Sequence, residues 1–129
     1  MKIMHKYIQE FTQCLKDARF YDAHEALEAA WFPRRFEKDK EVKLIKGFIN
    51  AAVSFELIKR GREEQSKKVW ANYLKYRPYL FAIDSAYQNN YYQLSRFIER
   101  LYQRGSRNPD FSLGKNAKEH ATLFSLLQP

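Results

Sequence analysis

Apolar side chains recur every three or four positions along most of the chain, which is the spacing of one face of an α-helix. In the first segment, lysine, glutamine and glutamate separate the apolar positions, which are Ile3, Tyr7, Phe11, Leu15 and Ala18. We therefore predict a first amphipathic helix over residues 3–18.

A break near residues 17–21 separates this helix from a second one, which contains the run from Ala23 to Trp31. The second helix should end at Phe32, because the proline at position 33 disfavours helical conformation in the residue before it. The charged residues that follow are then a connection.

The longest predicted helix runs from Glu41 to Arg60 and is apolar around most of its circumference, so we expect it at the centre of a bundle. Gly61 should close it, because glycine is favoured just past a helix end. Gly47 lies inside it, where glycine costs about 1 kcal/mol relative to alanine, which indicates the close approach of another helix.

The remaining pattern predicts a fourth helix from Glu63 to just before Pro78 and a fifth helix around residues 91–101. The inward positions of the fourth helix are Val69, Trp70, Tyr73 and Leu74. Residues 104–116 have loop composition, and we expect a short last helix over residues 117–127. Since no segment alternates with period two, the fold class is all-α: a single bundle of about five helices plus a short C-terminal helix.

Composition agrees with one domain over residues 1–129, since 45% of the residues are hydrophobic and 16% are aromatic. The single cysteine, Cys14, excludes an intramolecular disulfide, and its helical spacing after Phe11 predicts a buried thiol. No apolar run approaches the roughly 18 residues of a membrane span, so we predict no membrane partner and a cytoplasmic location.

The net charge of +8 is unevenly distributed along the chain. Residues 1–64 contain 13 basic and 11 acidic groups, whereas residues 65–129 contain 10 and 4. A basic surface of this kind is usually a solvated face, but it can also attract nucleic acid or anionic metabolites.

The run from Ala23 to Trp31 puts polar groups into an apolar stripe. At about 100° per residue, His24 falls close to Leu27 and Trp31, which predicts that its ring points toward the core. Glu28 lies at the edge of the stripe, and Glu25 lies further toward the polar side.

Glu56 is the second out-of-place residue, because its position on the helix wheel falls between Ile49 and Ala52 in the apolar arc. A carboxylate in such a place needs a partner. Our hypothesis is one polar site between the second and third helices that binds a small ligand, with these members: His24, Glu25, Glu28, Trp31, Asn50 and Glu56.

Three interpretations of this site stay open. The cluster can simply organise the core, since buried polar networks fix packing. It can hold a divalent metal ion, with His24, Glu28 and Glu56 as the ligands. Finally, His24 with Glu25 or Glu28 can perform acid–base catalysis in a hydrolase-like enzyme, although no nucleophile or phosphate-loop motif accompanies the pair.

The alternative function is nucleic-acid binding, which we place second because no nucleic-acid fold signature accompanies the basic residues. The turn between the third and fourth helices carries the cations that would contact phosphates, namely Lys59, Arg60, Arg62, Lys67 and Lys68. Further residues that would add charge or stacking follow, namely Tyr73, Lys75, Tyr76, Arg77 and Tyr79. The protein is a monomer or a homodimer, with Phe32 and Phe36 as a candidate dimer face.

Two motifs, AHEALEAAW and, about twenty residues on, KGFINAAVSFELIKRG, resemble the domain of unknown function 309 family over residues 20–80. The resemblance implies a single helical bundle, with the His-Glu motif of the second helix at His24, Glu25, Glu28 and Trp31. It also implies that Gly47 and Gly61 are the family's glycines of the third helix. The chain has Asn50, Glu56 and Arg62 where this family often has glutamine, histidine and asparagine. The resemblance implies no particular activity.

Overall fold

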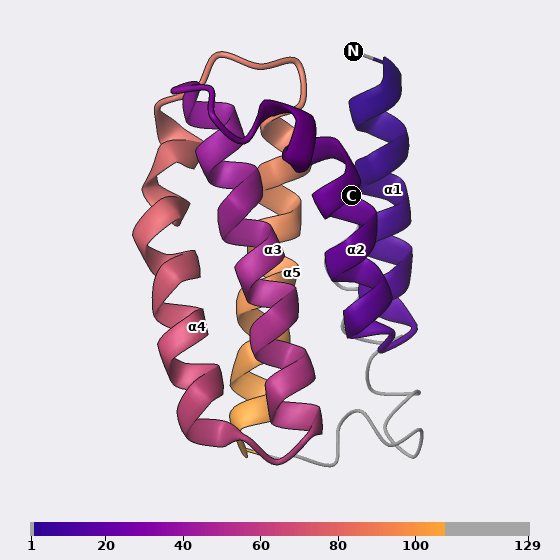
Figure 1. The fold of residues 1–129 in the computed structure, drawn as a ribbon, viewed down its shortest axis with the longest axis vertical. Coiled ribbons are helices and arrows are strands. Elements are labelled where there is room, and N and C mark those ends of the chain that lie inside the picture. Colours follow the sequence, from indigo (N-terminus) through magenta and orange to yellow (C-terminus); the bar gives the residue numbers. More distant parts are fainter. Residues whose placement is uncertain (1, 108–129) are drawn as a thin grey trace.

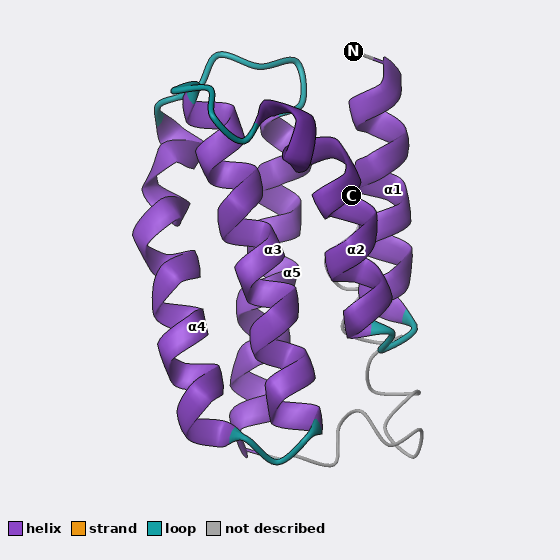
Figure 2. Ribbon diagram, viewed as in Figure 1, coloured by secondary structure: helices purple, strands orange, loops and turns teal. Residues whose placement is uncertain are grey.

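The structure is a computed structural model that describes residues 2–107. Its α-helices are α1 (Lys2–Lys16), α2 (Phe20–Trp31), α3 (Lys40–Lys59), α4 (Glu63–Tyr76) and α5 (Gln88–Arg107). Two short 3-10 helices follow α2 and α4, namely η1 (Phe32–Arg34) and η2 (Arg77–Phe81). There is no strand in this part of the chain (Figure 2), so the all-α prediction is confirmed.

The helix α3 lies at the centre of the bundle. It packs against α2 on one side and α4 on the other, while α1 covers the outer side of α2 (Figure 1). The helix α5 lies behind α3 in this view and also contacts it. Because α3 has neighbours on most sides, it needs apolar residues around most of its circumference, as predicted.

Two helices end in the same hydrogen-bonded motif, in which the last carbonyls are satisfied by the next backbone amides. After α3, the amides of Gly61 and Arg62 donate to Ile58 and Leu57, and Gly61 has φ of 75°. After α1, the amides of Ala18 and Arg19 donate to Leu15 and Cys14 in the same pattern. Here, however, the residue at the left-handed position is Ala18, with φ of 58°.

We expect that Ala18→Gly stabilises the protein by about 0.5 to 1 kcal/mol, because glycine has no Cβ to clash in the left-handed conformation. Gly61→Ala is the matched change in the opposite direction and should destabilise by a similar amount. Urea unfolding of both variants measures this. Destabilisation by Ala18→Gly would contradict the prediction.

Most helix boundaries agree with the sequence pattern to within a few residues, but two details were wrong. The helix α5 continues to Arg107, so residues 104–107 are not loop; residues 108–116 and 117–127 lie outside the described residues. Leu74 is 44% exposed, because the buried side of α4 lies between Trp70 and Tyr73 and leaves Leu74 at its edge.

The core confirms the predictions for Cys14 and Trp70, which are both buried. Burial raises the pKa of the Cys14 thiol, as expected for a packing residue rather than a reactive one. The Trp70 ring stacks on Tyr102 with 3.9 Å between ring centroids, which joins α4 to α5. Trp31 is partly buried and packs against the same core.

Two tyrosine–glutamate hydrogen bonds also hold α5 in place. Tyr73 of α4 donates to Glu99 Oε2 at 2.8 Å, and Tyr91 of α5 donates to Glu41 Oε2 of α3 at 2.6 Å. Burial raises the pKa of both tyrosines well above the usual range, and the carboxylates add to that rise. The hydroxyls therefore remain protonated and act as donors.

Candidate functional site

His24 lies on the edge of the buried side of α2 rather than inside the core. Its Nε2 is 3.1 Å from Glu28 Oε2, one turn further along the helix, and its ring lies 5.7 Å from the ring of Tyr21. The His24 side chain is 23% exposed and that of Glu28 is 44% exposed. Water therefore reaches this pair, and the ring that was predicted to point toward the core is only partly buried. The neighbouring Glu25 is exposed.

The hydrogen bonds of Asn50 and Glu56 join them to groups other than His24. The Asn50 side chain donates to the Lys46 carbonyl at 2.8 Å and accepts from Asn72 of α4 at 3.3 Å. The Glu56 carboxylate accepts from Arg60 at 2.7 Å. His24, Glu28 and Asn50 thus each have a partner on their own helix, and Glu56 has one at the end of its helix.

The described part of the chain contains no group of three or more His, Cys, Asp or Glu side chains that could hold a metal ion. His24, Glu28 and Glu56 are therefore not assembled as a three-ligand set.

The cations of the α3–α4 turn are exposed but partly neutralised. Arg60 pairs with Glu56 at 2.7 Å, and Lys67 pairs with Glu64 at 3.5 Å. Lys59 and Lys68 are exposed as well.

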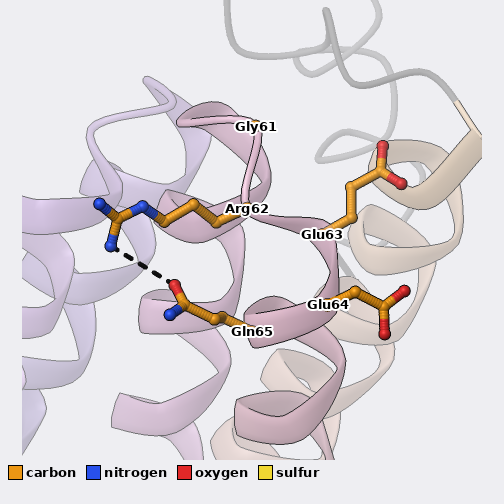
Figure 3. Close-up of a pocket in the computed structure, with 5 residues that line it drawn as sticks. All are labelled: Gly61, Arg62, Glu63, Glu64 and Gln65. Carbon is orange, nitrogen blue, oxygen red and sulfur yellow. Dashed lines mark hydrogen bonds between the residues drawn. The ribbon is translucent and has the colours of Figure 1, made fainter.

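A depression at this turn is lined by Gly61, Arg62, Glu63, Glu64 and Gln65 (Figure 3). Arg62 points toward Gln65, to which it donates a hydrogen bond of 3.4 Å, while Glu63 and Glu64 lie on the other side. Both signs of charge therefore meet here, which disfavours the turn as a surface for a polyanion.

A different set of side chains gathers at the opposite end of the same helix pair. We call it the lysine–tyrosine face, and it consists of Lys43, Lys46, Lys75, Tyr76 and Tyr79. The rings of Tyr76 and Tyr79 stack with 6.4 Å between centroids and 26° between planes. The Nζ of Lys46 and that of Lys75 lie 5.5 and 5.4 Å from the Tyr76 centroid. Lys43 Nζ lies 5.5 Å from the Tyr79 centroid.

The lysine–tyrosine face has no acidic partner within residues 2–107, since no ion pair joins its three lysines to a carboxylate there. Both tyrosines are only partly buried. An anion with an aromatic part could therefore meet both the cations and a ring here.

Gly47 positions this face. A Cβ at Gly47 would lie 2.9 Å from the Tyr76 Cβ, so only glycine lets α4 approach α3 this closely. The close approach puts the Tyr76 ring beside Lys46, one residue before the glycine. The packing role predicted for Gly47 is thereby confirmed.

Charge is concentrated in the part of the bundle that carries this face. Residues 40–107, which form α3 to α5, contain 14 basic and 6 acidic residues. Residues 2–31, which form α1 and α2, contain 4 and 5. The net positive charge of the chain therefore belongs to the three-helix part.

The sequence pattern indicated Lys75, Tyr76 and Tyr79 but missed Lys43 and Lys46, because these lie about thirty residues earlier and meet the tyrosines only through helix packing. Of the other residues that it indicated, Tyr73 is too buried to stack on a base, and Arg77 already has an acidic partner. Tyr73 is buried and Arg77 is partly exposed, and Tyr73 O–H and Arg77 Nη1 donate to the two oxygens of Glu99.

Part of the chain matches a known protein family. Residues 8–69 match the family model described as Domain of unknown function (DUF309). The matched segment, residues 8–69, belongs to the DUF309 family. The DUF309 match covers α2, α3 and parts of α1 and α4, so it includes the His24 motif and Lys43 and Lys46 but ends before Lys75.

No curated protein and no solved structure matches the chain. Within residues 2–107, none of the helices has the length and apolar character needed to cross a membrane.

Proposed function

We propose that the chain binds single-stranded nucleic acid through the lysine–tyrosine face. The observation that carries the proposal is the stacked pair of Tyr76 and Tyr79 surrounded by three lysines without carboxylate partners in the described part of the chain.

Both parts of this face match the chemistry of a single strand. Lysines bind phosphates through charge and release the counterions of the strand, which is the main source of sequence-independent affinity. Unpaired bases stack on tyrosine rings, and each such contact contributes about 1 to 3 kcal/mol. A duplex would offer the tyrosine rings no free base face, because its bases are already stacked on each other.

The position of the face in the fold supports the same function. It lies on the part of the bundle that holds the excess positive charge, which steers an anionic strand toward it. The α3–α4 turn is the weaker surface because Glu56 and Glu64 form ion pairs with two of its cations. The His24–Glu28 pair is the weaker candidate for a small-ligand or metal site, since water reaches both side chains and no third ligating group accompanies them within residues 2–107.

Reversing one charge on the face should weaken binding. For Lys46→Glu we expect about a tenfold loss of affinity for a fluorescein-labelled single-stranded oligonucleotide. The slope of log affinity against log salt concentration should also fall by the contribution of about one phosphate contact. Fluorescence anisotropy between about 50 and 200 mM salt measures both quantities.

Lys6→Glu is the matched control, because Lys6 is exposed on α1 and the change in net charge is the same. It should alter the affinity less than about twofold. Equal losses for Lys6→Glu and Lys46→Glu, or no binding by the unaltered protein at low salt, would refute the proposal.

A further inference from the structure

Two asparagines lie beside the lysine–tyrosine face on the same pair of helices. Asn50 is one turn after Lys46 on α3, and Asn72 is one turn before Tyr76 on α4. Residues four positions apart are neighbours on one side of a helix, so both asparagines lie on the side that carries the face. A hydrogen bond of 3.3 Å from Asn72 Nδ2 to Asn50 Oδ1 joins the two helices here. We call these two residues the asparagine pair.

The hydrogen bonds of the asparagine pair determine which way each amide points. The Lys46 carbonyl can only accept, so the Asn50 atom that lies 2.8 Å from it is the amide nitrogen Nδ2. Asn50 therefore directs its Oδ1 toward α4, where it accepts from Asn72 Nδ2. Asn72 is exposed. Its second N–H and its Oδ1 thus remain accessible to a ligand, as one donor and one acceptor side by side.

Positive charge lies on both sides of the asparagine pair. Lys46 and Lys75 lie toward one end of the helices, and Lys68, which is exposed and one turn before Asn72, lies toward the other. A strand whose phosphates contact these lysines passes the pair. An amide has no charge to attract a phosphate, but its donor and acceptor match the edge of a base. The asparagine pair is therefore placed to contact bases.

We propose that Asn72 selects adenine in the strand that binds the lysine–tyrosine face, an inference that rests on the proposed function of this face. One base stacks on the Tyr76 ring, and its edge meets Asn72, which lies about 6 Å further along α4. The Asn72 Oδ1 accepts from the N6 amino group of adenine, and its Nδ2 donates to N7. This two-bond pairing is the one by which asparagine recognises adenine in protein–DNA complexes.

The other bases fit the Asn72 amide less well. Guanine has the acceptor O6 where adenine has the amino group, so two oxygens would face each other. Cytosine and thymine lack the N7 edge, and their smaller rings cover less of the Tyr76 ring. The lysines do not discriminate among bases, since they contact phosphates.

Fluorescence anisotropy with labelled oligodeoxynucleotides tests the preference. The strands are identical except at their central positions, which carry adenine, guanine, cytosine or thymine. The unaltered protein should bind the adenine strand at least about fivefold more tightly than the others. 7-Deazaadenine keeps the ring size and the amino group but lacks the N7 acceptor, so its strand should lose most of this advantage. This comparison does not depend on the folding of any variant.

Asn72→Ala tests the protein side of the contact. It should lower the affinity for the adenine strand at least about fivefold and change that for the thymine strand less than about twofold. If Asn72 served only to join α3 to α4, all strands would be weakened equally, and the inference would be wrong. Gln9→Ala is the matched control, because it removes the same amide group from an exposed position on α1 and should alter neither affinity.

This inference and the proposed function can fail separately. If all strands bind with equal affinity, the inference about Asn72 is wrong and the proposed function stands. If adenine is preferred but 7-deazaadenine or Asn72→Ala leaves the preference intact, other groups cause it, and the inference is again wrong. If no strand binds at low salt, the proposed function is wrong and the inference falls with it.

Discussion

Phe48→Ala should lower the free energy of unfolding by about 3 to 5 kcal/mol. The Phe48 side chain is fully buried in α3, and its ring contacts Tyr73 of α4 and Tyr91 of α5 at centroid distances of 6.1 and 5.8 Å. Truncation to alanine removes the apolar contacts of three helices at once and leaves a cavity that they cannot easily fill. Urea unfolding monitored by circular dichroism gives the change.

Phe36→Ala is the matched control for this prediction. It removes the same atoms from a side chain that is 86% exposed, so it should change the free energy of unfolding by less than about 0.5 kcal/mol. Because Phe36 is exposed, its proposed role in a contact between two copies of the chain stays a prediction. Similar losses for the two variants would contradict the central position assigned to Phe48.

Glu99→Ala should be the second most damaging change, with a loss of about 2 to 3 kcal/mol. The substitution removes the acceptor of Tyr73, whose side chain is fully buried and has no access to water. Arg77 loses its partner too, but it is partly exposed and can bind water instead. The Tyr73 hydroxyl, which keeps only the Ser95 side chain as a partner, therefore accounts for most of the cost.

A double-mutant cycle with Tyr73→Phe tests that reason. Phenylalanine has no hydroxyl to leave unsatisfied, so Glu99→Ala should cost about 1 kcal/mol less in the Tyr73→Phe background. Equal costs in the two backgrounds would show that Glu99 stabilises the fold through Arg77 or through packing instead.

The helices were predictable because their signals are local. Each helix needs an apolar side to bury, and the three- or four-residue spacing displays that side in the sequence. The end signals are also local, since Pro33 and Gly61 limit the backbone conformation at or beside their own positions. The errors arose where a residue lies between the buried and the exposed side of its helix, as Leu74 does, because a neighbouring helix then decides its exposure.

The candidate site was less predictable. A helix wheel gives the direction of a side chain but not how far the neighbouring helix covers it. His24 has the direction of a core residue and remains 23% exposed, with Glu28 as its partner on the same helix. Glu56 and Asn50 likewise have partners that the wheel did not reveal, because these depend on rotamers and on Asn72 of α4.

The sequence by itself determined the all-α class, the central place of α3, the end of α3 at Gly61 and the overall positive charge, since each follows from local spacing or composition. Only the tertiary structure decided where the charge meets aromatic rings. Lys46 and Tyr76 are thirty residues apart in the sequence and come together because Gly47 lets α3 and α4 approach closely. The antiparallel packing of these two helices, which no local pattern encodes, creates the lysine–tyrosine face.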